Sequence, residues 1–180
     1  APTFSDAERV YVSGSSAGGY GAQMNVHQFA DAFGGSELHV LSDSGPMLQP
    51  SGGRLGEWDR AWTLQTPRGC EDCNTSLPVW YDHLVTTYPD SRFGLLTFDA
   101  DQTIHLYFGY PAGNSFNQAL VAYLDDHVEP AANAEVFALG GTQHVLLGGL
   151  TTTTAPGGTS LADWTTYWLE GDDAWTTVRP

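Results

Sequence analysis

Short apolar runs alternate with longer amphipathic stretches along the whole chain. The predicted strands cover residues 9–12, 38–41, 92–98 and 134–139, and the predicted helices cover 17–33, 77–87, 116–127 and 160–169. Strands separated by helices pair in parallel through right-handed crossovers. The pattern therefore predicts a single α/β domain over residues 1–180, a three-layer α/β/α sandwich with a mainly parallel sheet.

A glycine-flanked serine stands between the first predicted strand and the first predicted helix. Residues 14–18 read GSSAG and match the Gly-x-Ser-x-Gly motif. In this context the turn lifts the Ser16 hydroxyl above the sheet edge, and the Ala17 N–H at the helix start faces a developing oxyanion. We therefore expect Ser16 to be a nucleophile and Ala17 an oxyanion donor. The alternative is a glycine-rich turn that only connects two elements.

A serine nucleophile needs a base, and His144 has the most suitable position. It follows the last predicted strand and a Gly-Gly turn, which is where an α/β-hydrolase carries its histidine. The other histidines lie in predicted helices or strands, or beside an acidic turn: His27, His39, His83, His105 and His127. A satisfied loop histidine is the alternative for His144.

The third member of a triad would be a carboxylate after the penultimate strand. Asp99 leaves the strand first and is the preferred acid, while Asp101 and Asp43 are the alternatives. The order Ser16, Asp99, His144 is the Ser…Asp…His order of α/β-hydrolases. Acyl transfer by such a triad needs no metal or organic cofactor.

Three segments resemble the pectin acetylesterase/Notum family of α/β-hydrolases. They read SSAGG at 15–19, SDSG at 42–45 and FDADQ at 98–102. The last resembles the family's Asp-x-x-Gln acid segment, which favours Asp99 over Asp101. The resemblance implies a carboxylic ester hydrolase that deacetylates a polysaccharide such as pectin.

The resemblance covers almost the whole chain but only part of the family's domain. Family members have several strands before the nucleophile, together with a glycine-rich loop that supplies a second oxyanion donor. We expect the chain to be the C-terminal part of a longer domain, or to be completed by a second chain. Residues 1–180 alone are then expected to be weak or inactive, because losing one oxyanion donor costs about 10²–10³-fold in turnover.

The charge balance limits the partners of the chain. Asp and Glu total 21, the only basic side chains besides histidine are six arginines, and the formal net charge is −15. Such a charge repels nucleic acid and anionic membranes, and no apolar run approaches the ~20 residues of a membrane span. Adaptation to high salt is one explanation of this acidity, and genome composition is the other.

The aromatic residues and the charge leave other functions open. Trp58, Trp62, Trp80 and Tyr81 could stack against sugar rings, although such residues often pack in a core. The acidic surface disfavours polyanionic pectin, so a lipase-like or polyester (polyhydroxyalkanoate) depolymerase-like esterase is an alternative. A non-catalytic carbohydrate-binding or interaction module is a further one.

Residues 43–76 are rich in Gly, Pro and Ser and are predicted to form a long loop over the rim of the site. Within them Cys70 and Cys73 form a Cys-x-x-Cys pair with no second pair to complete a zinc site. We expect a local disulfide, with a redox motif or half of a zinc site as alternatives. A disulfide points to a secreted, extracellular or periplasmic protein.

Overall fold

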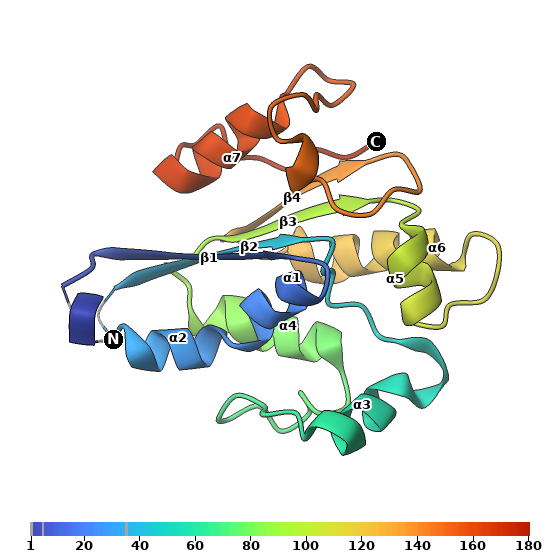
Figure 1. Cartoon of the computed structure of the whole chain (residues 1–180), viewed down its shortest axis with the longest axis horizontal. Coiled ribbons are helices and arrows are strands. Elements are labelled where there is room, and N and C mark those ends of the chain that lie inside the picture. The colour runs from blue at the N-terminus through green and yellow to red at the C-terminus, as the bar shows by residue number, and fades with distance from the viewer. Residues whose placement is uncertain (1, 5, 35) are drawn as a thin grey trace.

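A four-stranded parallel sheet forms the centre of the computed structural model, which describes residues 2–4, 6–34 and 36–180 (Figure 1). The strands follow one another in the order in which they occur in the sequence. Their bounds are β1 Arg9–Ser15, β2 Glu37–Asp43, β3 Phe93–Phe98 and β4 Ala134–Leu139. The prediction of an α/β fold with a parallel sheet is confirmed.

Helices follow each strand and supply the crossovers. They are α1 Ala17–Met24, α2 Val26–Ala32, α3 Arg54–Trp62, α4 Leu77–Thr87, α5 Gln102–Tyr107, α6 Ser115–Tyr123 and α7 Leu161–Glu170. Short 3₁₀ turns lie at η1 Pro2–Phe4, η2 Ser51–Gly53 and η4 Leu147–Gly149, and a π-helical turn, η3 Leu124–Val128, continues α6.

The predicted helix over 17–33 is two helices. Asn25 adopts φ −102° and ψ 11°, which is not helical, and its side-chain amide donates to the carbonyl of Gly21 at 2.8 Å. A side chain that competes for backbone groups in this way interrupts a helix. The second half, α2, is therefore a separate helix that begins at Val26.

The helices cover both faces of the sheet (Figure 1). The larger core lies between one face and α1, α4 and α6, with Val40, Leu95 and Val136 as sheet residues. The smaller core lies between the other face and α7, where the indoles of Trp164 and Trp168 pack on the sheet. Alternate residues of β2, β3 and β4 serve the two cores, as expected for strands buried on both faces.

The expected loop over 43–76 is only partly irregular, because it contains η2 and α3. Cys70 and Cys73 form the expected disulfide in its second half. Ser76 then caps α4 by accepting a hydrogen bond from the Val79 N–H at 3.3 Å. None of the helices in the described ranges is long and apolar enough to cross a membrane.

All four strands end at the same edge of the sheet, since they are parallel. The outer side of β4 is covered by the C-terminal segment, where Val178 bonds in parallel to Val136 and Ala138. Among the described residues β1 pairs with β2 alone. The presence of further strands before β1, in this chain or a second one, stays a prediction.

Candidate active site

Ser16 occupies a strained turn between β1 and α1. Its backbone has φ 57° and ψ −123°, which a residue with a side chain rarely adopts. Its N–H donates to the carbonyl of Asp43 at 2.7 Å, and this bond fastens the turn to the end of β2. The serine is half-buried, and Ala17 behind it begins α1 with an exposed position. The Ala17 N–H belongs to the first helical turn and has no acceptor inside the helix.

The glycines of the motif differ in what they do. A Cβ on Gly14 would overlap the carbonyl oxygen of Gly18, so residue 14 must be glycine. A Cβ on Gly18 would meet nothing, whereas one on Gly19 would lie 2.8 Å from the Ser42 hydroxyl. Close packing therefore requires glycine at 14 and 19. Gly45 has the same need, since its Cβ would lie 2.9 Å from the backbone at the start of α1.

His144 is held by Asp101, the alternative acid, and the preference for Asp99 is wrong on this point. The Nδ1 atom of His144 lies 2.7 Å from Oδ2 of Asp101. Because a carboxylate only accepts, this contact makes Nδ1 a donor, so in the neutral form of the ring Nε2 is the nitrogen with the free lone pair. The second oxygen of Asp101 accepts from the N–H groups of Thr103 and Ile104 at 2.9 and 3.1 Å.

Asp99 instead joins the ends of β3 and β4. Its Oδ1 accepts from the N–H of Gly141 at 2.8 Å. Asp101 reaches the imidazole because it is the N-cap of α5, which fixes its position. The sequence analysis did not predict this helix. An aspartate followed by Ile104 and Phe108 at helical spacing is the signal that could have revealed it.

In the described part of the chain no hydrogen bond joins the side chains of Ser16 and His144. Nε2 of His144 is buried and has no partner there. The backbone N–H of Val145 donates to the Ser44 hydroxyl at 2.9 Å, and the N–H of Ser16 donates to the carbonyl of Asp43. Asp43, the last residue of β2, and Ser44 after it thus bind the backbone of the candidate nucleophile and of the residue that follows the candidate base.

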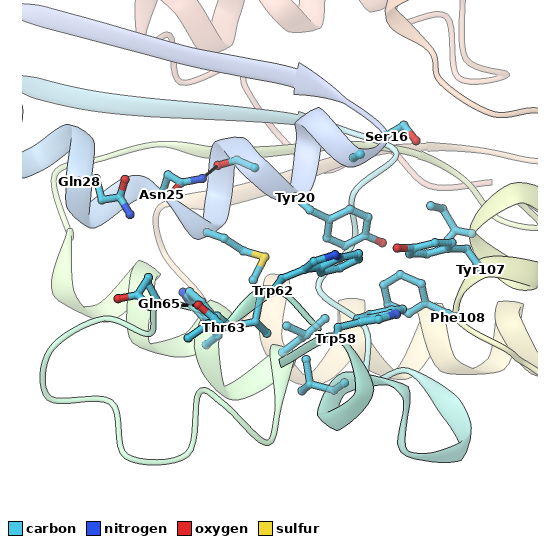
Figure 2. Close-up of a pocket in the computed structure, with 18 of the residues that line it drawn as sticks. Ser16, Tyr20, Asn25, Gln28, Trp58, Trp62, Thr63, Gln65, Tyr107 and Phe108 are labelled. Atoms are coloured by element: carbon cyan, nitrogen blue, oxygen red, sulfur yellow. Dashed lines mark hydrogen bonds between the residues drawn. The ribbon is translucent and has the colours of Figure 1, made fainter. Parts of the chain in front are cut away.

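A cavity of about 520 Å³ opens beside Ser16 (Figure 2). Its walls come mainly from α1, α3, α4 and α5, and from the segment after α3. The lining side chains are uncharged and mainly apolar or aromatic; those used below are Ser16, Tyr20, Met24, Trp58, Trp62 and Tyr107. Strain recurs at its wall, where Thr63 has φ 53°. The cavity suits an uncharged apolar group.

Three aromatic rings form one wall of the cavity. Trp58 stacks on Trp62 and on Tyr107, with ring centroids 6.1 and 5.1 Å apart (Figure 2). Trp62 and Tyr107 are exposed on their outer sides, so aromatic surface continues from the cavity to solvent. Burial and the Asp101 carboxylate raise the pKa of Tyr20, which also lines the cavity, well above its usual range. Its hydroxyl stays protonated and donates to the carbonyl of Pro46 at 3.0 Å.

The remaining sequence candidates have mixed positions. Trp80 lines the cavity, and Tyr81 is buried in the larger core. His105 lines a second cavity of about 430 Å³, on α5 and the turn after it. In the described ranges no cluster of three or more His, Cys, Asp or Glu residues has the arrangement of a metal site.

Asp43 has a place that the sequence analysis did not predict. As a possible acid it would have contacted the imidazole, but its carboxylate binds the Ser15 hydroxyl and the N–H groups of Leu146 and Leu147. From the sequence, the SDSG segment carries only the family resemblance and has no predicted structural role. Its position directly after a buried strand was the available signal.

No protein-family model matches the sequence, and no curated protein is significantly similar to it. The function must therefore be argued from the geometry of the site.

Proposed function

We propose that this chain is a serine carboxylic ester hydrolase. One observation carries the proposal: a buried Asp101 carboxylate fixes the His144 ring, whose Nε2 is buried and unpaired in the described chain. Buried polar atoms are nearly always hydrogen-bonded, so an unpaired imidazole nitrogen calls for an explanation. The explanation that we propose is the strained turn carrying Ser16, which is held at the end of β2. In unliganded sites catalytic hydrogen bonds often tighten only when substrate binds.

The reaction follows from these positions. Nε2 of His144 takes the proton of Ser16 as Oγ attacks the ester carbonyl carbon, while Asp101 stabilises the imidazolium. The developing oxyanion lies against the Ala17 N–H and the start of α1. The alcohol departs with the proton from Nε2, and a water molecule then releases the acid by the same steps with His144 as base. The resemblance to the α/β-hydrolases of the pectin acetylesterase/Notum family is consistent with this order of residues.

Two substrate classes follow from two different observations. The resemblance implies acetyl esters of a polysaccharide such as pectin, outside the cell. The uncharged, aromatic cavity beside Ser16 favours a larger apolar acyl group, as in a lipase-like or polyester depolymerase-like esterase. Acetate would leave most of a 520 Å³ cavity unfilled. The charge of −15 also opposes a polyanionic substrate.

Covalent labelling tests the reaction class. A fluorophosphonate probe should label the chain at Ser16, and Ser16→Ala should abolish labelling and reduce ester hydrolysis by about 10³-fold or more. Ser15→Ala serves as the matched control, since Ser15 lies next in the chain with its hydroxyl on Asp43, and it should still be labelled. Wild-type protein that neither reacts with the probe nor hydrolyses any ester would support the binding-module alternative.

A series of 4-nitrophenyl esters tests the substrate class. If the cavity receives the acyl group, kcat/KM should rise from acetate to hexanoate by about tenfold or more, since each buried CH₂ contributes ~0.8 kcal/mol. Trp62→Ala should reduce the hexanoate rate more than the acetate rate. A preference for acetate that persists, together with acetyl release from acetylated pectin, would favour the polysaccharide esterase.

A further inference from the structure

The Asp43 carboxylate is a buried charge that is held only by uncharged donors. The residue is fully buried, and its oxygens accept from the Ser15 hydroxyl at 2.8 Å, from Leu146 N–H at 2.7 Å and from Leu147 N–H at 3.2 Å. No ion pair involving Asp43 occurs within the described ranges. Burying a carboxylate is costly, so these three bonds must be well formed for it to be tolerated.

The donors come from two segments that are far apart in the sequence. Ser15 precedes the candidate nucleophile, whereas Leu146 and Leu147 follow the candidate base by two and three residues. The next residue along, Ser44, accepts from Val145 N–H at 2.9 Å, and its own N–H donates to the carbonyl of Leu96 in β3 at 2.7 Å. The Asp43–Ser44 pair is therefore anchored to the sheet and holds both segments.

Both segments are strained where they are held. Ser16, Ser44 and Val145 have φ of 57°, 56° and 64°. For Val145, a β-branched residue, this is a true outlier. Such conformations persist only where surrounding contacts fix them. Here the N–H groups of Ser16 and Val145 are bonded to Asp43 and Ser44, which supply those contacts.

We propose that Asp43 is a positioning residue, whose carboxylate ties the loop that carries His144 to the strand end that carries Ser16. The inference rests on the roles assigned to these two residues in the proposed function. Asp101 fixes the direction of the imidazole, and Asp43 fixes the distance of its loop from the nucleophile. An error of about 1 Å in such a distance reduces turnover by up to about 10²-fold.

Asp43→Asn separates this role from simple filling of space. The amide has nearly the same shape, but one carboxylate oxygen becomes an NH₂ group that cannot accept. If the remaining oxygen keeps Leu146 N–H, the NH₂ group faces Leu147 N–H and that donor loses its partner. The loop after His144 should loosen while the sheet remains intact.

Two measurements on the full chain test the inference. The control is Asp82→Asn, which changes a residue of α4 that pairs with His127. In Asp43→Asn, the backbone amides of Leu146 and Leu147 should exchange with solvent at least about tenfold faster. The kcat for 4-nitrophenyl acetate, per site counted with the fluorophosphonate probe, should fall about 10²-fold with KM changed less than about threefold. Asp82→Asn should leave both quantities within about twofold.

Unchanged exchange at Leu146 and Leu147 in Asp43→Asn would overturn the inference. So would fewer labelled sites with an unchanged kcat per site, since that is the result of a purely structural role. If Asp43→Asn does not fold, Ser44→Ala replaces it and should speed exchange at Val145 and lower kcat per site about tenfold; no change in either would again overturn the inference. If the wild type hydrolyses nothing, the proposed function fails, while the exchange measurement still decides whether Asp43 holds the loop.

Discussion

Two histidines of this fold contact an aspartate through Nδ1, and the pairs have very different surroundings. His144 and Asp101 lie 2.7 Å apart at the carboxyl edge of the sheet. His127 and Asp82 lie 2.9 Å apart on the helices below it. The imidazoles are similarly exposed, at 21% and 25%, but the Asp101 side chain is fully buried and that of Asp82 is 47% exposed. The carboxylate, more than the histidine, distinguishes the pairs.

The surroundings of the rest of each ring extend the contrast. Nε2 of His144 is buried without a partner in the described chain. The His127 ring stacks on Tyr123, with centroids 5.7 Å apart, in the π-helical turn after α6. A contact between aspartate and histidine is thus no evidence of catalysis by itself. It becomes informative where the acid is buried and the far nitrogen is buried without a partner.

Removing each imidazole gives the largest expected difference. His144→Ala should lower kcat for 4-nitrophenyl esters by about 10⁴-fold or more, because Ser16 loses its base. His127→Ala should leave kcat within about twofold and change the free energy of unfolding by about 1 kcal/mol or less, since exposed ion pairs contribute little. Steady-state kinetics and urea denaturation measure the two effects. Equal losses of activity in both variants would remove the distinction between the pairs.

Removing each carboxylate gives a smaller difference and decides which acid holds His144. Asp101→Asn should reduce kcat by about 10³–10⁴-fold, because an amide favours the wrong tautomer of the ring. Asp82→Asn should have almost no effect.

Asp99→Asn is the informative comparison within the same turn. It weakens a bond to Gly141 N–H and does not touch the imidazole, so we expect a loss of about tenfold or less. A larger loss in Asp99→Asn than in Asp101→Asn would restore Asp99 as the acid. Circular dichroism of both variants would exclude unfolding as the cause.

The sequence predicted the elements of this fold well, because its periodicities are local. All four strands lie within a few residues of their predicted positions. Two short helices were missed. α5 has six residues and α3 lies in a segment rich in glycine and proline, and both owe their stability to packing against the cavity wall.

The site was predicted less completely than the fold. The turn that carries Ser16 could be predicted from its motif, because neighbouring residues determine the strand before it and the helix after it. The choice between Asp99 and Asp101 depended on how the chain turns after β3, over a distance of two residues. The role of Asp43 depended on a loop about a hundred residues away, and no local pattern encodes a contact of that kind.

A third histidine, without an aspartate, extends the comparison to stability. His39 is buried in the first half of β2, where its Nδ1 accepts from Arg92 N–H at 3.1 Å and Glu37 lies 3.5 Å from Nε2. Burial, followed by the charge of Arg92, lowers its pKa below the usual 6.5, although the nearby Glu37 partly offsets this. Folding therefore favours the neutral ring.

The lowered pKa of His39 decides how the free energy of unfolding changes with pH. Below about pH 6.5, His39 binds a proton in the unfolded chain but not in the folded chain. Acidification therefore stabilises the unfolded state until the pH reaches the lowered pKa of the folded state. We expect the free energy of unfolding to fall between pH 7.5 and 5, and His39→Asn, which keeps an acceptor for Arg92 N–H, to flatten that fall. Urea denaturation at several pH values measures it.

The kcat of His39→Asn at pH 7.5 should stay within about twofold of wild type, because β2 carries His39 away from the carboxyl edge where Ser16 lies. A pH profile of stability that is identical in the variant would show that His39 is protonated equally in both states, and the contrast would then concern activity alone.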